Sequence, residues 1–198
     1  MQTLTPDAAI QRSLVKRFRK ELWQPFVAAC KRYALVPEGA MVTVCLDGTT
    51  PMLLAAALLE ELHRHSDVPF ELTVTDHVAA ATERFVIPDC MSDVTETVLT
   101  AMLREGETRG VLPIESPDEH GIIHIRPLYC IEEKDIRAFC RYNRLLYVPR
   151  EVDPKRQMAR ALLDTVKKDD PDAEIRVFRA LHSVHADTFP KTCDNKKV

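Results

Sequence analysis

The sequence lacks the segments and cysteine patterns that define several classes of protein. Its longest apolar run, from Met52 to Leu59, is far shorter than the roughly 20 residues that a membrane-spanning helix requires. No stretch resembles a signal peptide. Six cysteines are dispersed and form no Cys-x-x-Cys pair, which argues against a structural zinc site and a disulfide framework. We therefore expect a cytoplasmic protein without membrane association or a bound metal, whose cysteines mostly pack as small hydrophobic residues.

Length and charge indicate one core with basic ends. A chain of 198 residues with 45% hydrophobic residues can bury one sizeable core. We divide it into a basic amphipathic N-terminal helix (1–40), an α/β core (41–150) and a C-terminal helical extension with a tail (151–198). The net charge is −3, with seven basic and three acidic side chains in 1–40 but six and eighteen in 41–135. Basic ends can meet RNA phosphates, although solvated helix faces explain any single cluster equally well.

One stretch of the chain predicts the opening unit of an α/β nucleotide-binding fold. A β-branched run over residues 42–46 precedes a small-residue turn over 47–51, and an apolar helix follows with Leu54 and Leu58 on one face. This order of strand, loop and helix is typical of sites where backbone N–H groups and the helix dipole hold phosphate.

The same stretch resembles the PP-loop family of tRNA 2-thiocytidine synthetases and other tRNA-thiolating synthetases. In that family the loop reads Ser-Gly-Gly-x-Asp-Ser and wraps the pyrophosphate of ATP. The match places Asp47, Gly48, Thr49 and Thr50 on the first four positions and Pro51 on the Asp. Asp47 puts a carboxylate where the anion should lie, Thr49 adds a Cβ at a close approach, and Pro51 removes an N–H donor. We interpret these residues as a degenerate nucleotide-binding loop.

The resemblance continues at two later segments. Residues 92–97 align with an x-Asp-Asp motif and a Gln/Glu-Thr pair, and residues 125–136 follow Ile-Arg-Pro-Leu and Glu-Lys-Asp-Ile with the same spacing. The resemblance therefore implies a possible polar site made of Asp93, Glu96, Thr97 and Arg126. A capped amphipathic helix with Ser92 as its N-cap, and a pairing of Arg126 with a carboxylate, explain the same residues without a ligand.

Other parts of the family pattern are missing. The family reaction, as the resemblance implies, adenylates a cytidine with ATP, and sulfur held by cysteines and an iron–sulfur cluster then displaces AMP. Here Asp89 and Cys90 stand on the two positions of a His pair, and the three family cysteines have no counterpart. We assign no catalytic residue. The altered loop argues against the ATP and Mg²⁺ that the family implies, and the missing cysteines argue against a cluster.

The remaining pattern consists mainly of helices and short strands. The spacing predicts one long helix from Thr5 to about Tyr33, a short helix over 77–83, and later helices over 92–103, 132–139, 153–168 and 172–183. It predicts further strands over 70–74, 84–87, 122–128 and 145–149. Basic side chains of the first and the C-terminal helices are candidates for RNA contact, against ordinary solvated helix faces. These candidates are Arg12, Lys16, Arg19, Lys155, Arg156 and Arg160.

Together these patterns predict a Rossmann-like parallel sheet of the adenine nucleotide alpha hydrolase-like type, with an N-terminal helix and a C-terminal helical extension. Our leading hypothesis is a catalytically degenerate PP-loop protein that acts in tRNA binding or modification, or as a partner subunit or homo-oligomer. The alternative is an active enzyme that holds a nucleotide through a rebuilt phosphate site and metal-bridging carboxylates. A third hypothesis is an RNA-binding protein that uses only its basic helices.

Overall fold

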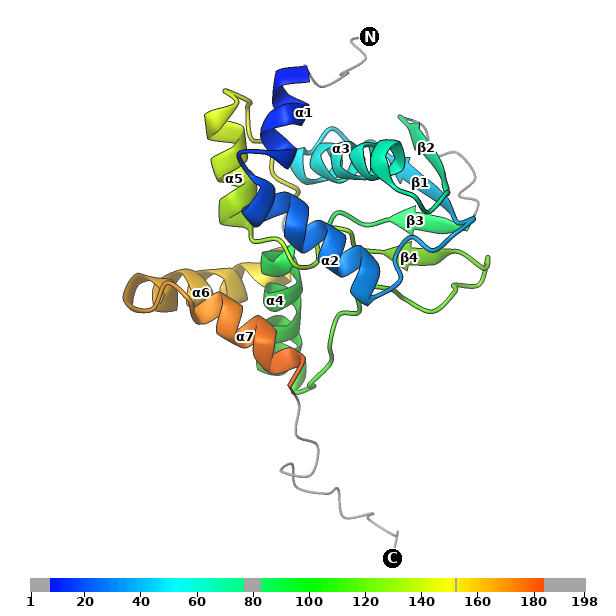
Figure 1. The fold of residues 1–198 in the computed structure, drawn as a ribbon. Coiled ribbons are helices and arrows are strands. Elements are labelled where there is room, and N and C mark those ends of the chain that lie inside the picture. Colours follow the sequence, from blue (N-terminus) through cyan, green and yellow to red (C-terminus); the bar gives the residue numbers. More distant parts are fainter. Residues whose placement is uncertain (1–7, 77–82, 152, 184–198) are drawn as a thin grey trace, which may run out of the picture.

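The fold is built on a parallel sheet with the strand order β2-β1-β3-β4 (Figure 1). The computed structural model describes residues 8–76, 83–151 and 153–183. The strands are β1 (Met41–Cys45), β2 (Glu71–Thr75), β3 (Arg84–Val86) and β4 (Ile123–Ile125). The helices are α1 (Ala8–Val15), α2 (Gln24–Arg32), α3 (Thr50–His65), α4 (Met91–Thr100), α5 (Glu133–Tyr142), α6 (Gln157–Asp169) and α7 (Ala173–Leu181). Two π-helical segments, η1 (Arg19–Trp23) and η2 (Ala101–Glu105), and a 3-10 turn, η3 (Pro154–Arg156), complete the described elements.

The strand order places a topological switch point between β1 and β3. From β1 the chain passes through α3 to β2 on one side, and from β3 it passes through α4 to β4 on the other. All the strand pairs are parallel, so their carboxyl ends share one edge of the sheet, toward α4 and α5 (Figure 1). In open α/β sheets, ligands bind in the crevice outside these ends, where the strand order reverses.

One hydrophobic core joins the N-terminal helices to the sheet, α3 and α5. Val42 and Val44 of β1 are buried against Leu54 and Leu58 of α3, because a parallel sheet covered by helices buries near-continuous apolar strands. A smaller cluster around Tyr129 joins α4 to α7. The C-terminal helices are thus attached through α4, and not through the sheet itself.

The predicted N-terminal helix is interrupted in the structure. Its buried face is confirmed, but α1 and α2 are separated by a turn and by η1. Pro25, in the first turn of α2, has no N–H to bond the carbonyl of Glu21, and such a missing donor favours a local change of helical pitch. The face that packs into the core consists of Leu14, Phe18, Leu22, Phe26 and Cys30.

Two local predictions are wrong. Residues 145–149 are not a strand, because Val148 bonds to Thr50 at the start of α3 and does not join the sheet. The N-cap of α4 is Cys90 and not Ser92, since the Ser92 hydroxyl donates instead to Glu174 of α7. The predicted start at Thr5 and most of the short helix over 77–83 lie outside the described residues.

None of the described helices is both long enough and apolar enough to cross a lipid bilayer.

Core packing between α3 and the sheet predicts a large effect of one truncation. Replacing Leu58, which is fully buried, by Ala should lower the free energy of unfolding by about 2–5 kcal/mol, because the methyl groups leave a cavity. Urea denaturation followed by circular dichroism measures this. Leu146→Ala is the matched control, since that side chain is 84% exposed, and a loss as large as that of Leu58→Ala would contradict the assignment of the core.

Candidate functional site

The loop between β1 and α3 is closed by its own carboxylate. Asp47 Oδ1 accepts hydrogen bonds from the Thr49 backbone N–H at 2.9 Å and from the Thr49 hydroxyl at 2.6 Å. Gly48 lies between them with φ = 80°, a left-handed conformation that favours glycine. The Asp47 carboxylate thus occupies the Thr49 N–H, a backbone donor that a bound phosphate would need.

The first turn of α3 is covered by a distant segment of the chain. The Thr50 N–H donates to the Val148 carbonyl at 2.8 Å, and the Val148 N–H donates back to the Thr50 hydroxyl at 2.8 Å. Pro51, the next residue, has no N–H to offer. The N–H groups of Thr49 and Thr50 are therefore both occupied, although N–H groups of this kind make a helix N-terminus an anion site.

The covering segment, residues 146–150, continues across the switch point to the end of β3. Arg150 forms an ion pair with Asp89, which follows β3, and Arg126 reaches the same carboxylate at 2.9 Å. Tyr147 donates its hydroxyl to Glu133 of α5 at 2.7 Å. We call residues 146–150 the strap, because they are bonded to α3, α5 and Asp89 and lie over the crevice where α/β folds bind ligands.

Two of the predicted polar-site residues are neutralised by two of the predicted RNA-binding residues. Arg156 bonds to Asp93 at 2.7 Å and to Glu96 at 2.9 Å, and Arg160 bonds to Glu96 at 2.6 Å. Glu96 is only 3% exposed. Burial raises the pKa of Glu96, and hydrogen bonds from Arg160 and Arg156 oppose that shift. The carboxylates of α4 thus dock the C-terminal extension onto the core through ion pairs.

Cys90, which aligns with the second residue of the family's His pair, lies in an environment that disfavours a reactive thiolate. Cys90 is buried, its N–H and its Sγ both donate to Asp93 Oδ2, and burial together with the charge of Asp93 raises the thiol pKa well above its usual value. A reactive cysteine needs the opposite environment, near positive charge. Within the described ranges, no three His, Cys, Asp or Glu side chains are grouped so as to hold a metal ion.

The other predicted site residues have ordinary structural contacts or face solvent. The Thr97 hydroxyl donates to the Asp93 carbonyl within α4 at 2.8 Å. Arg126 is buried between Asp89 and Glu115, which agrees with the simpler of its two interpretations. Among the RNA candidates, Arg156 and Arg160 are engaged in the ion pairs above. The exposed candidates are Arg12, Lys16, Arg19 and Lys155.

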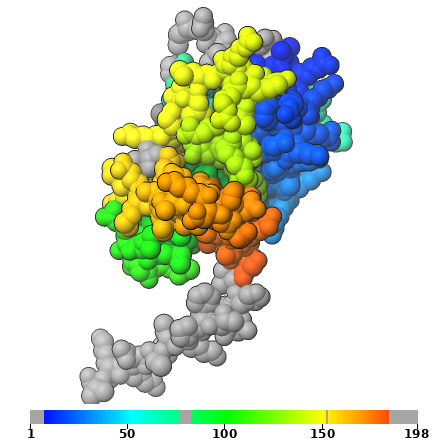
Figure 2. All heavy atoms as spheres, turned by 90° about the vertical axis from the view of Figure 1, so that its left-hand side faces the viewer, coloured from blue at the N-terminus to red at the C-terminus, as the bar shows by residue number. Residues whose placement is uncertain are grey.

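The exposed candidates of the N-terminal helices lie near two arginines at the end of α5, Arg141 and Arg144, which the sequence did not single out. The Ser13 hydroxyl of α1 donates to Asn143 at 3.0 Å, and the rings of Phe18 and Tyr142 are 5.6 Å apart, so α1 lies against the end of α5. Figures 1 and 2 agree on this arrangement. We call the exposed cations of this region, with Tyr142 among them, the basic face. Its members are Arg12, Lys16, Arg17, Arg19, Lys20, Arg141 and Arg144.

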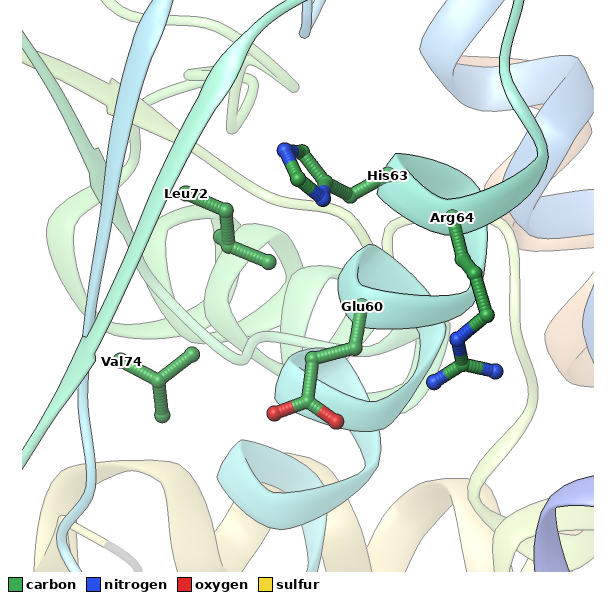
Figure 3. A pocket seen from close by; sticks show the side chains of 5 residues that line it. All are labelled: Glu60, His63, Arg64, Leu72 and Val74. Carbon is green, nitrogen blue, oxygen red and sulfur yellow. The ribbon is translucent and has the colours of Figure 1, made fainter.

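Two hollows in the described surface lie away from the loop. One of about 410 Å³ lies between α3 and the edge strand β2, where Glu60, His63 and Arg64 face Leu72 and Val74 (Figure 3). A second, of about 460 Å³, is lined by charged side chains of α4, α5, α6 and α7. Neither includes residues 47–50, so the ancestral loop opens into neither of these cavities.

The chain is similar to curated tRNA-thiolating enzymes over about half of its length. It is 31% identical over 101 residues to the tRNA-cytidine(32) 2-sulfurtransferases of Citrifermentans bemidjiense and Geobacter sp. strain M21. Each match covers 48% of this chain and 40% of the relative. The chain resembles the PP-loop proteins that thiolate tRNA. The resemblance predicted from the loop and the later motifs is thus confirmed, while no family model matches the sequence.

The fold of this PP-loop-like chain also has a counterpart among solved structures. The U34-tRNA thiolase NcsA from Methanococcus maripaludis, described with its [4Fe-4S] cluster, aligns with a TM-score of 0.58. The alignment covers 86% of this chain and 80% of that chain at 13% identity. At this identity the likeness shows the fold alone, and it confirms the α/β class with a parallel sheet.

The ion pairs at Glu96 predict a measurable loss of stability. Replacing Glu96 by Gln should lower the free energy of unfolding by about 3 kcal/mol at pH 7, because Arg156 and Arg160 would lose the buried charge that neutralises them. Urea denaturation provides the measurement. Glu105→Gln is the control, since its partner Arg109 is exposed and such surface pairs contribute about 0–1 kcal/mol. Equal effects of the two substitutions would contradict the role of Glu96.

Proposed function

We propose that this protein is a PP-loop relative of the tRNA-thiolating synthetases that no longer carries out their ATP chemistry and acts as a tRNA-binding or partner protein in tRNA modification. The observation that carries the proposal is the strap. It bonds to Thr50 after β1 and to Asp89 after β3, so the two loops that flank the switch point contact the chain itself. The carboxylate of Asp47 adds a second obstacle to phosphate.

The alternative, an active enzyme with a rebuilt phosphate site, has less support. It needs Asp47, Asp93 and Glu96 as free carboxylates for a bridging metal. Asp47 is bonded to Thr49, and the two carboxylates of α4 are paired with arginines. A metal ion would have to displace two guanidinium groups from Glu96 before it could bridge to a phosphate.

The basic face supports tRNA binding, which is one of the two roles that we propose. Arginines and lysines from α1, η1 and the end of α5 are exposed together, and Tyr142 among them is 59% exposed. Clustered cations bind phosphates through counterion release, and an exposed aromatic ring offers a stacking surface for an unpaired base. The ionic pairing of Arg156 and Arg160 makes the basic face a better candidate for RNA than the C-terminal helices.

Nucleotide binding is the direct test of the lost chemistry. Isothermal titration calorimetry of the full chain with MgATP should detect no binding with a dissociation constant below about 1 mM, since the N–H donors of the loop are occupied. Asp47→Ser should not restore binding, because the Val148 carbonyl still accepts the Thr50 N–H and Pro51 still has no backbone N–H to donate. Micromolar affinity for MgATP, or release of AMP or pyrophosphate with tRNA present, would refute the proposal.

Charge removal on the basic face tests tRNA binding. In fluorescence anisotropy with an unmodified tRNA transcript, replacing both Lys16 and Arg141 by Gln should weaken binding and lower the slope of log K against log salt by about 2, one unit for each phosphate contact. Arg104→Gln with Arg109→Gln is the matched control, because η2 lies at the opposite end of the molecule from α1 (Figure 1). Equal slopes for the two double variants, or no binding of the unaltered protein at low salt, would count against this face.

A further inference from the structure

The outer side of α6 carries an apolar stripe that no described segment covers. Met158, Leu162 and Val166 are 52%, 44% and 43% exposed. Their spacing of four residues places them along one side of the helix, over a length of about 12 Å. In Figure 1, α6 lies beside α7 at the edge of the molecule and away from the sheet. Because the three side chains are contiguous along one side of the helix, they form a candidate interaction surface.

The opposite side of α6 already has its partners, so the stripe is not a misplaced core face. Ala159 and Leu163 are buried, Arg160 pairs with Glu96, and Lys167 pairs with Glu174 at 2.8 Å. These contacts fix the rotation of α6 about its axis. The helix would have to break its ion pairs before it could turn the apolar stripe inward.

The two ends of the stripe carry opposite charges. Lys155 lies in η3, three residues before Met158, and Asp169 is the last residue of α6, three residues after Val166. Because the chain is helical from η3 into α6, these spacings keep both residues near the side of the helix that carries the stripe. Both are exposed, and neither makes an ion pair with another described residue. This side of the helix carries a cation at its start, apolar residues in its middle and an anion at its end. Two copies in antiparallel orientation would therefore place each cation opposite an anion.

We propose that the protein associates with a second copy of itself through α6, antiparallel about a two-fold axis at Leu162. In this register Leu162 meets Leu162 of the second copy, Met158 meets its Val166, and Lys155 meets its Asp169. Ala161 and Thr165 flank the stripe with small side chains, which allow the helices to approach closely. A two-fold axis of this kind forms a closed dimer, because the same patch is used on both copies.

The interface is small, which sets the expected affinity. One helix pair buries less than the roughly 800 Å² per partner of a standard stable interface, so we expect a dissociation constant on the order of tens of micromolar. The contact uses neither the loop nor the basic face. Its failure would therefore leave the proposed function untouched, and loss of the proposed function would leave it standing.

Sedimentation equilibrium of the full chain, from about 1 to 500 µM, tests the dimer. The unaltered protein should shift from monomer to dimer, and Leu162→Glu should raise the dissociation constant at least about 30-fold, because two carboxylates would meet at the axis. Leu146→Glu is the matched control, since Leu146 is exposed but lies on the strap. Circular dichroism of both variants shows whether they remain folded.

A charge exchange tests the register without altering the apolar residues. Lys155→Glu alone and Asp169→Lys alone should each weaken the dimer about threefold or more, and the double variant should restore it, because the exchanged charges pair again across the axis. A protein that stays monomeric up to 500 µM overturns the proposal and leaves α6 to a different protein partner. Self-association that is lost in Leu146→Glu but kept in Leu162→Glu, or no rescue by the charge exchange, overturns it as well.

Discussion

The arrangement of this protein depends on the contact between the strap and the first turn of α3. Two hydrogen bonds join Val148 to Thr50, and the ion pair of Arg150 with Asp89 carries the same segment to the end of β3. Buried N–H and C=O groups at a helix end must find partners, and in a nucleotide-binding fold the ligand supplies some of them. Here the polypeptide itself supplies a partner for the Thr50 N–H at the start of α3.

The same logic extends to the carboxylates of α4. The charge of Glu96 is buried and that of Asp93 is partly buried, and both would be costly without cations. Arg156 and Arg160 of the C-terminal extension provide these cations. These carboxylates therefore form a docking site between two parts of the chain. These ion pairs attach the C-terminal extension, including α6, to α4.

Several features followed from the sequence because they depend on neighbouring residues. Periodicity predicts the strand over 42–46, the helix after Pro51 and the buried face of the N-terminal helices. The structure agrees, with β1 at Met41–Cys45. Other predictions failed where distant contacts decide the outcome. The run 145–149 has the composition of a strand, but Val148 is bonded to α3. Ser92 is a good N-cap by type, but its hydroxyl is taken by Glu174, 82 residues away.

The sequence by itself determined the α/β class, the weakened loop and the resemblance to tRNA-thiolating proteins, since strand and helix periods and residue types at a motif are local properties. Only the tertiary structure decided which charges remain available. Arg12 and Arg156 are the same residue type and were both RNA-binding candidates, yet one faces solvent and the other lies between two carboxylates. The physical reason is that an ion pair depends on which elements pack together. The packing of η3 and α6 against α4 involves contacts between residues 60 and 64 positions apart in the chain.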